Sequence, residues 1–121
     1  MNLFKFLLSS ALWATFAVQP ALAAQNGNVV EVVTFKLKAG VSAAEFAPLD
    51  QAVEREHVAK QPGFVSRESA HGVDGDWLVI VHWRSVKDAE ASMATFEKAA
   101  AAAQFMSKIE PSTMSMKRYQ K

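Results

Sequence analysis

The segment Asp76–Arg84 (DWLVIVHWR) constrains the fold of this chain more than any other segment. Its Val, Ile and Trp content predicts a β-strand, in which successive side chains point to opposite faces of the sheet. One face would carry Trp77, Val79, Val81 and Trp83, and the other would carry Leu78, Ile80, His82 and Arg84. Both sets are apolar over most of their length. A sheet with this strand must be covered on both faces, because each buried Val, Leu or Ile contributes roughly 1.5–3 kcal/mol.

Turn and cap signals divide the rest of the chain into elements. Ser42 followed by Glu45 fits a capping box, and it opens a helix whose apolar stripe is Phe46, Leu49, Val53 and His57. Ser85 opens a second helix, with a stripe of Ala89, Met93, Phe96 and Ala100. The predicted strands are Asn28–Lys38, Phe64–His71, Asp76–Arg84 and Thr113–Tyr119, with an Asp-Gly turn between the second and third.

The resulting order, β-α-β-β-α-β, predicts an α+β fold. It is the ferredoxin-like arrangement, in which two helices cover one face of a four-stranded antiparallel sheet. The helices leave the second apolar face without cover, and so large an exposed apolar patch favours association. A second copy of the chain, placed sheet against sheet about a two-fold axis, would supply that cover. We therefore expect a homodimer.

Residues 1–23 have the pattern of a secretory signal peptide. Lys5 supplies a positive charge, Phe6–Val18 is apolar, and Pro20 precedes the small residues of Ala21–Ala23. The apolar run is shorter than the roughly 20 residues that a membrane-spanning helix needs. We expect cleavage after Ala23 or Ala24, which leaves residues 24–121 as one domain in the periplasm or outside the cell, without a membrane anchor.

Composition excludes several classes of function. The chain has no Cys, which rules out disulfides, thiolate metal sites and a thiol nucleophile. Its 13 Lys and Arg against 12 Asp and Glu give no basic surface for nucleic acid. The three His, at positions 57, 71 and 82, do not form a recognisable metal motif, and no nucleotide-binding fingerprint is visible. We expect neither a metal nor a cofactor.

Four short stretches carry a resemblance to a known family. They are Phe35–Gly40, Pro62–Phe64, Val81–Ser85 and Ile109–Ser112. With the order of elements, they resemble the dimeric α+β barrel superfamily and, within it, antibiotic biosynthesis monooxygenase (ABM) domains. The resemblance covers residues 24–121 and implies a dimeric barrel. Its members include cofactor-independent oxygenases of aromatic polyketides, haem-degrading enzymes and quinol oxygenases.

The resemblance implies three readings of function. The first is a cofactor-independent monooxygenase that acts on a small apolar or aromatic molecule. The second is a non-catalytic ligand-binding or stress-related protein that uses the same pocket. The third, a haem-binding protein, is disfavoured because the Asn and His positions of the haem-degrading members fall at Val33 and at Met93-Ala94.

Two residues are candidates for catalysis. His57 lies on the apolar stripe of the first helix, where it could act as a base or be a core residue satisfied by one hydrogen bond. Glu31 interrupts an apolar strand. A poorly solvated carboxylate there could remove a proton from a phenolic or enolic substrate, as a cofactor-free oxygenase requires. Alternatively, Glu31 pairs with Arg84 at the rim of the sheet.

Four further residues are candidates for binding the substrate. Trp83 matches the Trp that ends this strand in the family, and it is either a pocket wall or a core residue. Phe35, Met93 and Phe96 could complete the wall, although such residues more often only pack. His82 should face away from Trp83, into the dimer barrel, with Arg84 or Glu31 as its partner.

Overall fold

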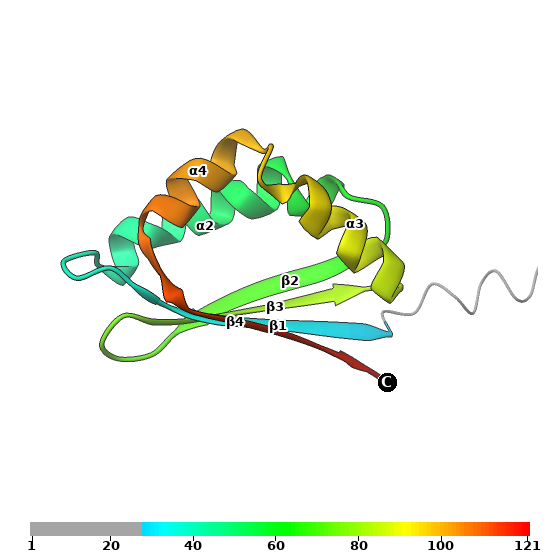
Figure 1. Cartoon of the computed structure of the whole chain (residues 1–121), viewed down its shortest axis with the longest axis horizontal. Coiled ribbons are helices and arrows are strands. Elements are labelled where there is room, and N and C mark those ends of the chain that lie inside the picture. Colours follow the sequence, from blue (N-terminus) through cyan, green and yellow to red (C-terminus); the bar gives the residue numbers. More distant parts are fainter. Residues whose placement is uncertain (1–27) are drawn as a thin grey trace, which may run out of the picture.

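The structure is a computed structural model, and it describes residues 28–121 (Figure 1). The predicted signal peptide lies outside the described residues. The strands are β1 (Val29–Leu37), β2 (Phe64–His71), β3 (Asp76–Trp83) and β4 (Ile109–Gln120). The helices are α2 (Ala43–Glu56), the short 3-10 helix η2 (Val58–Lys60), α3 (Val86–Phe96) and α4 (Ala100–Ser107).

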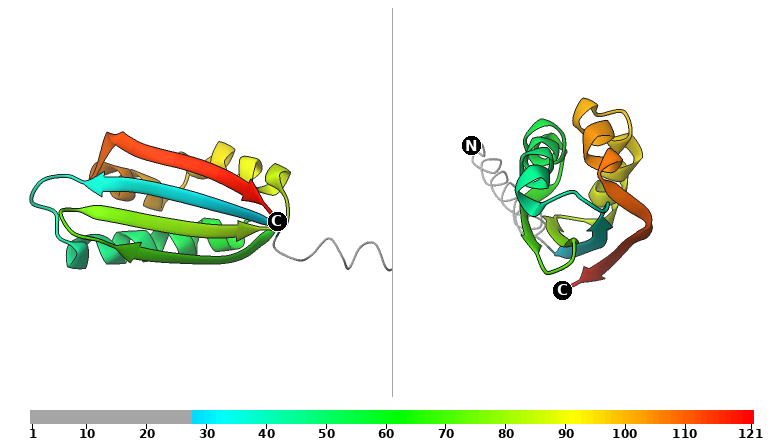
Figure 2. Two further views of the ribbon diagram at one scale, coloured as in Figure 1. Left: turned by 90° about the horizontal axis from the view of Figure 1, so that it is seen from below. Right: turned by 90° about the vertical axis from the view of Figure 1, so that its left-hand side faces the viewer.

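The four strands form one antiparallel sheet in the order β2-β3-β1-β4. The helices within residues 28–121 all lie on one face of it, with α2 beside α3 and α4, and no described residue covers the other, open face (Figures 1 and 2). This arrangement confirms the predicted α+β, ferredoxin-like fold. No helix within residues 28–121 is long and apolar enough to cross a membrane.

The alternation predicted for β3 is confirmed. Trp77, Val79, Val81 and Trp83 are each at most 5% exposed and face the helices. They join Phe46 of α2, which is fully buried and meets the Trp77 ring edge-on, with ring centroids 4.8 Å apart. The aromatic side chains therefore fix how α2 sits on the sheet.

The open face of the sheet carries the alternate residues of the central strands, which point away from the helices. Val30, Val32, Leu78 and Ile80 are half-buried there, and Tyr119 is 54% exposed. His82 also lies on this face, as predicted, but its partner is the Ser66 hydroxyl at 3.1 Å, not Arg84 or Glu31. The open face is thus an apolar strip along the two central strands.

The second helical segment differs from the prediction of one continuous helix. The chain leaves helical geometry at Ala99, which is extended with φ −76° and ψ 137°, and resumes as α4. The break lets α4 pack beside α2, where Phe105 lies 5.1 Å from Phe46, ring centroid to ring centroid. Here tertiary packing outweighs the high helix propensity of the alanine run.

The last strand begins earlier than predicted, at Ile109 rather than Thr113. It includes Pro111, which cannot donate a ladder hydrogen bond. The register between β1 and β4 shifts between Thr34 and Lys36, and the Lys36 amide donates to the Thr113 hydroxyl at 2.9 Å. This side-chain bond and the shift in register accommodate the proline.

The capping box predicted at the start of α2 is present. The Glu45 amide donates to the Ser42 hydroxyl at 3.0 Å, and the Ser42 amide donates to the Glu45 carboxylate at 3.1 Å. These bonds from Ser42, the backbone bond foremost, lower the pKa of Glu45 below its ordinary value. The helix then runs through Pro48 without ending.

Gly63 joins η2 to β2 at a point where only glycine fits. Its φ is +83°, and a Cβ there would lie 2.1 Å from Oδ2 of Asp88, which also accepts a hydrogen bond from Ser85 at the start of α3. Gly63→Ala should therefore cost more stability than Gly40→Ala, which has φ +87° but open space around it. We expect about 1–2 kcal/mol for Gly40→Ala and about 1–3 kcal/mol more for Gly63→Ala. Urea denaturation of both variants measures the difference, and equal losses would contradict the steric account.

Candidate functional site

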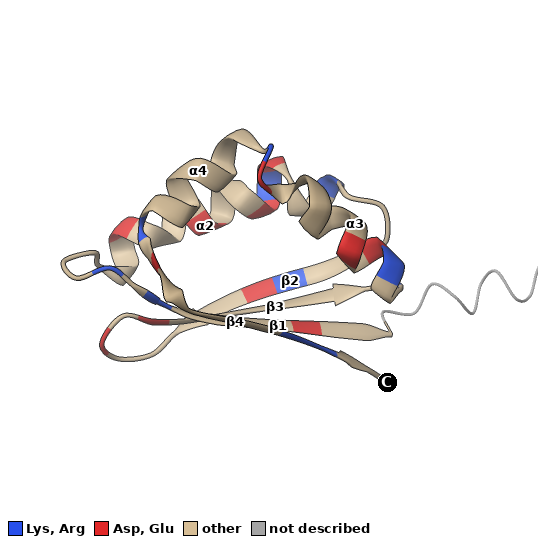
Figure 3. Cartoon of the chain, viewed as in Figure 1, with Lys and Arg blue, Asp and Glu red and all other residues tan. Residues whose placement is uncertain are grey.

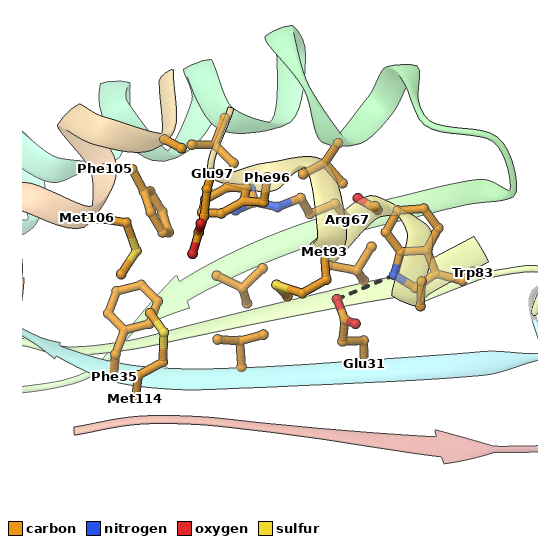
Figure 4. A pocket seen from close by; sticks show the side chains of 18 of the residues that line it. Glu31, Phe35, Arg67, Trp83, Met93, Phe96, Glu97, Phe105, Met106 and Met114 are labelled. Atoms are coloured by element: carbon orange, nitrogen blue, oxygen red, sulfur yellow. Dashed lines mark hydrogen bonds between the residues drawn. The ribbon is translucent and has the colours of Figure 1, made fainter. Parts of the chain in front are cut away.

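A cavity of about 410 Å³ lies between the helices and the helix-facing side of the sheet (Figure 4). This volume is within the range typical of small-molecule sites. Its walls come from all four strands and from α2, η2, α3 and α4. They are mostly apolar, including Phe35, Phe96, Phe105, Met93, Met106 and Met114. Glu31, Arg67, Ser92 and Glu97 are its polar members. The cavity is therefore an apolar pocket with a few polar groups in its lining.

Most of the predicted site residues meet in this pocket. Glu31, Trp83, Phe35, Met93 and Phe96 all line it. They come from β1, β3 and α3, so the sheet register and the seating of α3 bring them together (Figure 4). The structure thus places Trp83 and Glu31 on the same face of the sheet, which the sequence left open.

His57 is the exception, because it is not among the residues that line the pocket. It is 7% exposed at the end of α2, and its Nε2 lies 3.3 Å from the carbonyl oxygen of Ser92. A carbonyl only accepts, so Nε2 carries the hydrogen, and Nδ1 can accept from the Gln61 amide at 3.4 Å. His57 therefore links the end of α2 to α3 with both ring nitrogens in use.

Glu31 is 5% exposed and holds two hydrogen bonds. Its Oε2 accepts from Nε of Arg118 at 2.7 Å, and its Oε1 accepts from the Trp83 indole N–H at 3.4 Å. The partner is thus Arg118 of β4, not Arg84. A carboxylate accepts about four hydrogen bonds, so each oxygen keeps a lone pair for a ligand.

A second buried ion pair, which was not predicted from the sequence, borders the pocket. Arg67 of β2 donates to both carboxylate oxygens of Asp50, at 2.7 Å and 3.2 Å. The Ser69 hydroxyl also donates to Asp50, at 2.6 Å. The side chains of Arg67 and Asp50 are only 3% and 5% exposed. Two signals pointed to it: Arg67 and Ser69 share a strand face, and Asp50 lies one turn from Phe46 on the buried stripe.

The two ion pairs stand in one row across the sheet. Arg67 pairs with Val81, Val81 pairs with Glu31, and Glu31 pairs with Arg118, each on the neighbouring strand. Adjacent strands lie about 4.8 Å apart, so the backbones of Arg67 and Glu31 are about 10 Å apart. A ligand lying over Val81 would have a cation at one end and a carboxylate at the other.

The described part of the chain offers little for a metal site or for haem binding. Among residues 28–121, no group of three or more His, Asp or Glu side chains is arranged to hold a metal ion. Val33 and Met93, where the resemblance would place the Asn and His of haem-degrading enzymes, are apolar members of the pocket. Charges of both signs are interspersed over the described helices and strands (Figure 3). The charged side chains in the pocket lining are Glu31, Arg67 and Glu97.

Comparison by sequence finds no match, either among family descriptions or among curated proteins. Solved structures do match. SnoaB, a cofactor-independent oxygenase from Streptomyces nogalater, has a TM-score of 0.64 and 19% identity, covering 78% of this chain and 92% of that chain. A monooxygenase from Streptomyces coelicolor, solved with nanaomycin D, has a TM-score of 0.61 and 18% identity, covering 78% and 87%.

A protein from Shewanella oneidensis has a TM-score of 0.58 and 14% identity, covering 79% of this chain and 93% of that chain. At this level of identity the likeness shows the fold. The chain therefore has the fold of antibiotic biosynthesis monooxygenases, as its sequence predicted.

Proposed function

We propose that this chain is an exported, homodimeric monooxygenase that acts without a cofactor on a small aromatic molecule. The observation that carries the proposal is the Glu31 carboxylate, which stands beside Trp83 in an apolar pocket of about 410 Å³. The shared fold with a cofactor-independent oxygenase is supporting analogy.

The chemistry uses dioxygen and electrons from the substrate. Glu31 accepts a proton from a benzylic or enolisable C–H, and the resulting carbanion passes one electron to dioxygen. The substrate radical and superoxide then combine into a C–O bond, giving a peroxide. The protonated peroxide loses water and leaves a carbonyl group, so a CH₂ group and dioxygen become C=O and water. No external reductant is needed.

Oxygen uptake tests this proposal. Anthrone is a suitable probe, because its CH₂ group is acidic and its product, anthraquinone, is stable. We expect enzyme-dependent consumption of one dioxygen per anthrone, measured with an oxygen electrode against the uncatalysed rate. Saturable binding of anthrone without faster oxygen uptake would overturn the catalytic proposal.

That last result would instead support a non-catalytic binding protein. One observation favours this second candidate. Arg118 already donates to one oxygen of Glu31 at 2.7 Å, so the carboxylate serves in part as the partner of a structural ion pair.

The homodimer in the proposal rests on the open face of the sheet. One row across that face runs Glu68, Ile80, Val32, Lys117, with opposite charges at its ends. A two-fold axis parallel to the strands sets Ile80 against Val32 of the second copy and Glu68 against its Lys117. This arrangement would bury the apolar strip and pair its flanking charges.

Ile80→Lys should break the dimer, because it puts a charge at the centre of the apolar strip. We expect sedimentation at micromolar concentration to show a dimer for the wild-type protein and half that mass for the variant. Val73→Lys, in the turn between β2 and β3, should leave the mass unchanged, since Val73 is 74% exposed and off this face. A wild-type monomer at this concentration would contradict the proposal.

The export part of the proposal rests on residues 1–23. Expression of the full chain in a bacterium should yield a periplasmic protein whose mass and N-terminal sequence correspond to cleavage after Ala23 or Ala24. An unprocessed cytoplasmic chain would contradict it.

A further inference from the structure

Arg67 has donors that the protein does not use. A guanidinium group carries five N–H donors. Those of Nη1 meet Asp50 and Ser69, and one from Nη2 meets Asp50 at 2.7 Å. Within residues 28–121, Nε donates to no acceptor and Nη2 keeps its second N–H. These two hydrogens lie on the same edge of the guanidinium and form a fork that can hold an oxygen atom.

The free edge of the Arg67 guanidinium is not completely covered by other protein atoms. Among residues 28–121, the Trp77 indole nitrogen is the only buried side-chain N or O atom without a hydrogen-bond partner. The unpartnered Nε of Arg67 is therefore in contact with open space. Arg67 lines the pocket (Figure 4), and its side chain is 3% exposed. Its two hydrogen bonds to Asp50 hold the guanidinium in place.

The charges around Arg67 determine which acceptor suits it. Asp50 already neutralises the guanidinium, a Glu54 oxygen lies 3.5 Å from Nη1, and Glu97 also lines the pocket. An anionic ligand group would meet a surplus of negative charge there. A neutral oxygen, such as a ketone, can accept from the fork without that repulsion.

We propose that Arg67 is a specificity-determining residue that binds a neutral carbonyl oxygen of the ligand. The inference rests on the proposed function for the pocket and narrows its ligand class. The ligand is an aromatic compound with its carbonyl at Nε and Nη2 of Arg67 and its acidic C–H or O–H group at Glu31. The aromatic body lies over Val81, which separates the two residues in the row across the sheet.

Three matched probes test the assignment by isothermal titration calorimetry. 4-Hydroxyacetophenone has the hydroxyl and a neutral carbonyl, 4-ethylphenol lacks the carbonyl at nearly the same size, and 4-hydroxybenzoate replaces it with a carboxylate. A hydrogen bond to a charged group predicts that the ketone binds roughly tenfold or more tightly than 4-ethylphenol. The carboxylate should bind more weakly than the ketone.

The Arg67→Lys variant separates the effect of the paired N–H donors from the effect of the positive charge. Lysine keeps the positive charge beside Asp50 but has no planar pair of donors. We expect the preference for 4-hydroxyacetophenone over 4-ethylphenol to fall to about twofold or less, with 4-ethylphenol binding as in the wild-type protein. Arg55→Lys is the control, because the Arg55 side chain is 67% exposed on α2 and should leave the preference intact.

If Arg67→Lys fails to fold, the three probes still test the proposed role of Arg67 in the wild-type protein. Equal binding of ketone and ethyl probes, stronger binding of the carboxylate, or no binding of any probe would overturn the assignment. An unchanged preference in a folded Arg67→Lys protein would also overturn it. The proposed oxygenation is tested independently of Arg67. A clear preference for the ketone probe without anthrone oxidation would support the role of Arg67 and contradict the proposed catalysis.

Discussion

Replacing Asp50 with alanine is expected to lower the free energy of unfolding by about 3–5 kcal/mol. The reason is the charge that the substitution leaves behind. Arg67, with a side chain only 3% exposed, loses both of its short bonds to Asp50 and keeps only Glu54, 3.5 Å away, as an ionic partner. Chemical denaturation followed by circular dichroism measures the loss.

Two further variants separate this effect from the loss of any ion pair. Glu56→Ala removes the exposed pair with Arg55 and should cost less than about 1 kcal/mol. Asp50→Leu combined with Arg67→Met removes both buried charges and should recover most of the stability lost in Asp50→Ala. An Asp50→Ala protein whose free energy of unfolding falls by less than about 1 kcal/mol would contradict this account.

Replacing Glu31 with glutamine is expected to slow anthrone oxidation by about 10²–10⁴-fold. Glutamine has nearly the same shape and can still accept from the Trp83 indole, but it cannot take a proton from the substrate. Oxygen uptake at saturating anthrone measures the rate, and calorimetric titration checks that anthrone still binds.

Glu90→Gln is the matched control for this variant. Glu90 is exposed on α3 and is not part of the pocket lining, so its replacement should leave the rate unchanged. A Glu31→Gln protein that oxidises anthrone at the wild-type rate would show that this carboxylate is not the base.

The sequence was sufficient for the fold because its strongest signals are local. The alternation in Asp76–Arg84, the Asp-Gly turn and the Ser42 capping box each depend on neighbouring residues, and all three are present in the structure. The Asp-Gly turn has positive φ at both Asp74 and Gly75, as a tight hairpin requires. Such features need no knowledge of register.

Predicting which residues meet in the site requires the register of the strands, and local sequence patterns do not specify that register. Glu31 and Trp83 could be named from the sequence, but their shared face required the pairing of β1 with β3. The partner of Glu31 lies 87 positions away, at Arg118 on the edge strand, and no local pattern links the two residues. Arg67 was missed for the same reason, because its importance comes from Asp50 on a different element.

The two described tryptophans allow a direct test of the central claim that the pocket beside Glu31 holds the aromatic ligand. Trp83 lines that pocket, whereas Trp77 is buried in the core among Phe46 and its neighbours and does not line it. We propose titrating ¹⁵N-labelled protein with anthrone in the absence of oxygen and following the indole N–H signals, assigned with Trp83→Phe. The account predicts a saturable shift of the Trp83 signal with little change at Trp77. A Trp83 signal that stays in place while anthrone binds, or a larger shift at Trp77, would contradict it.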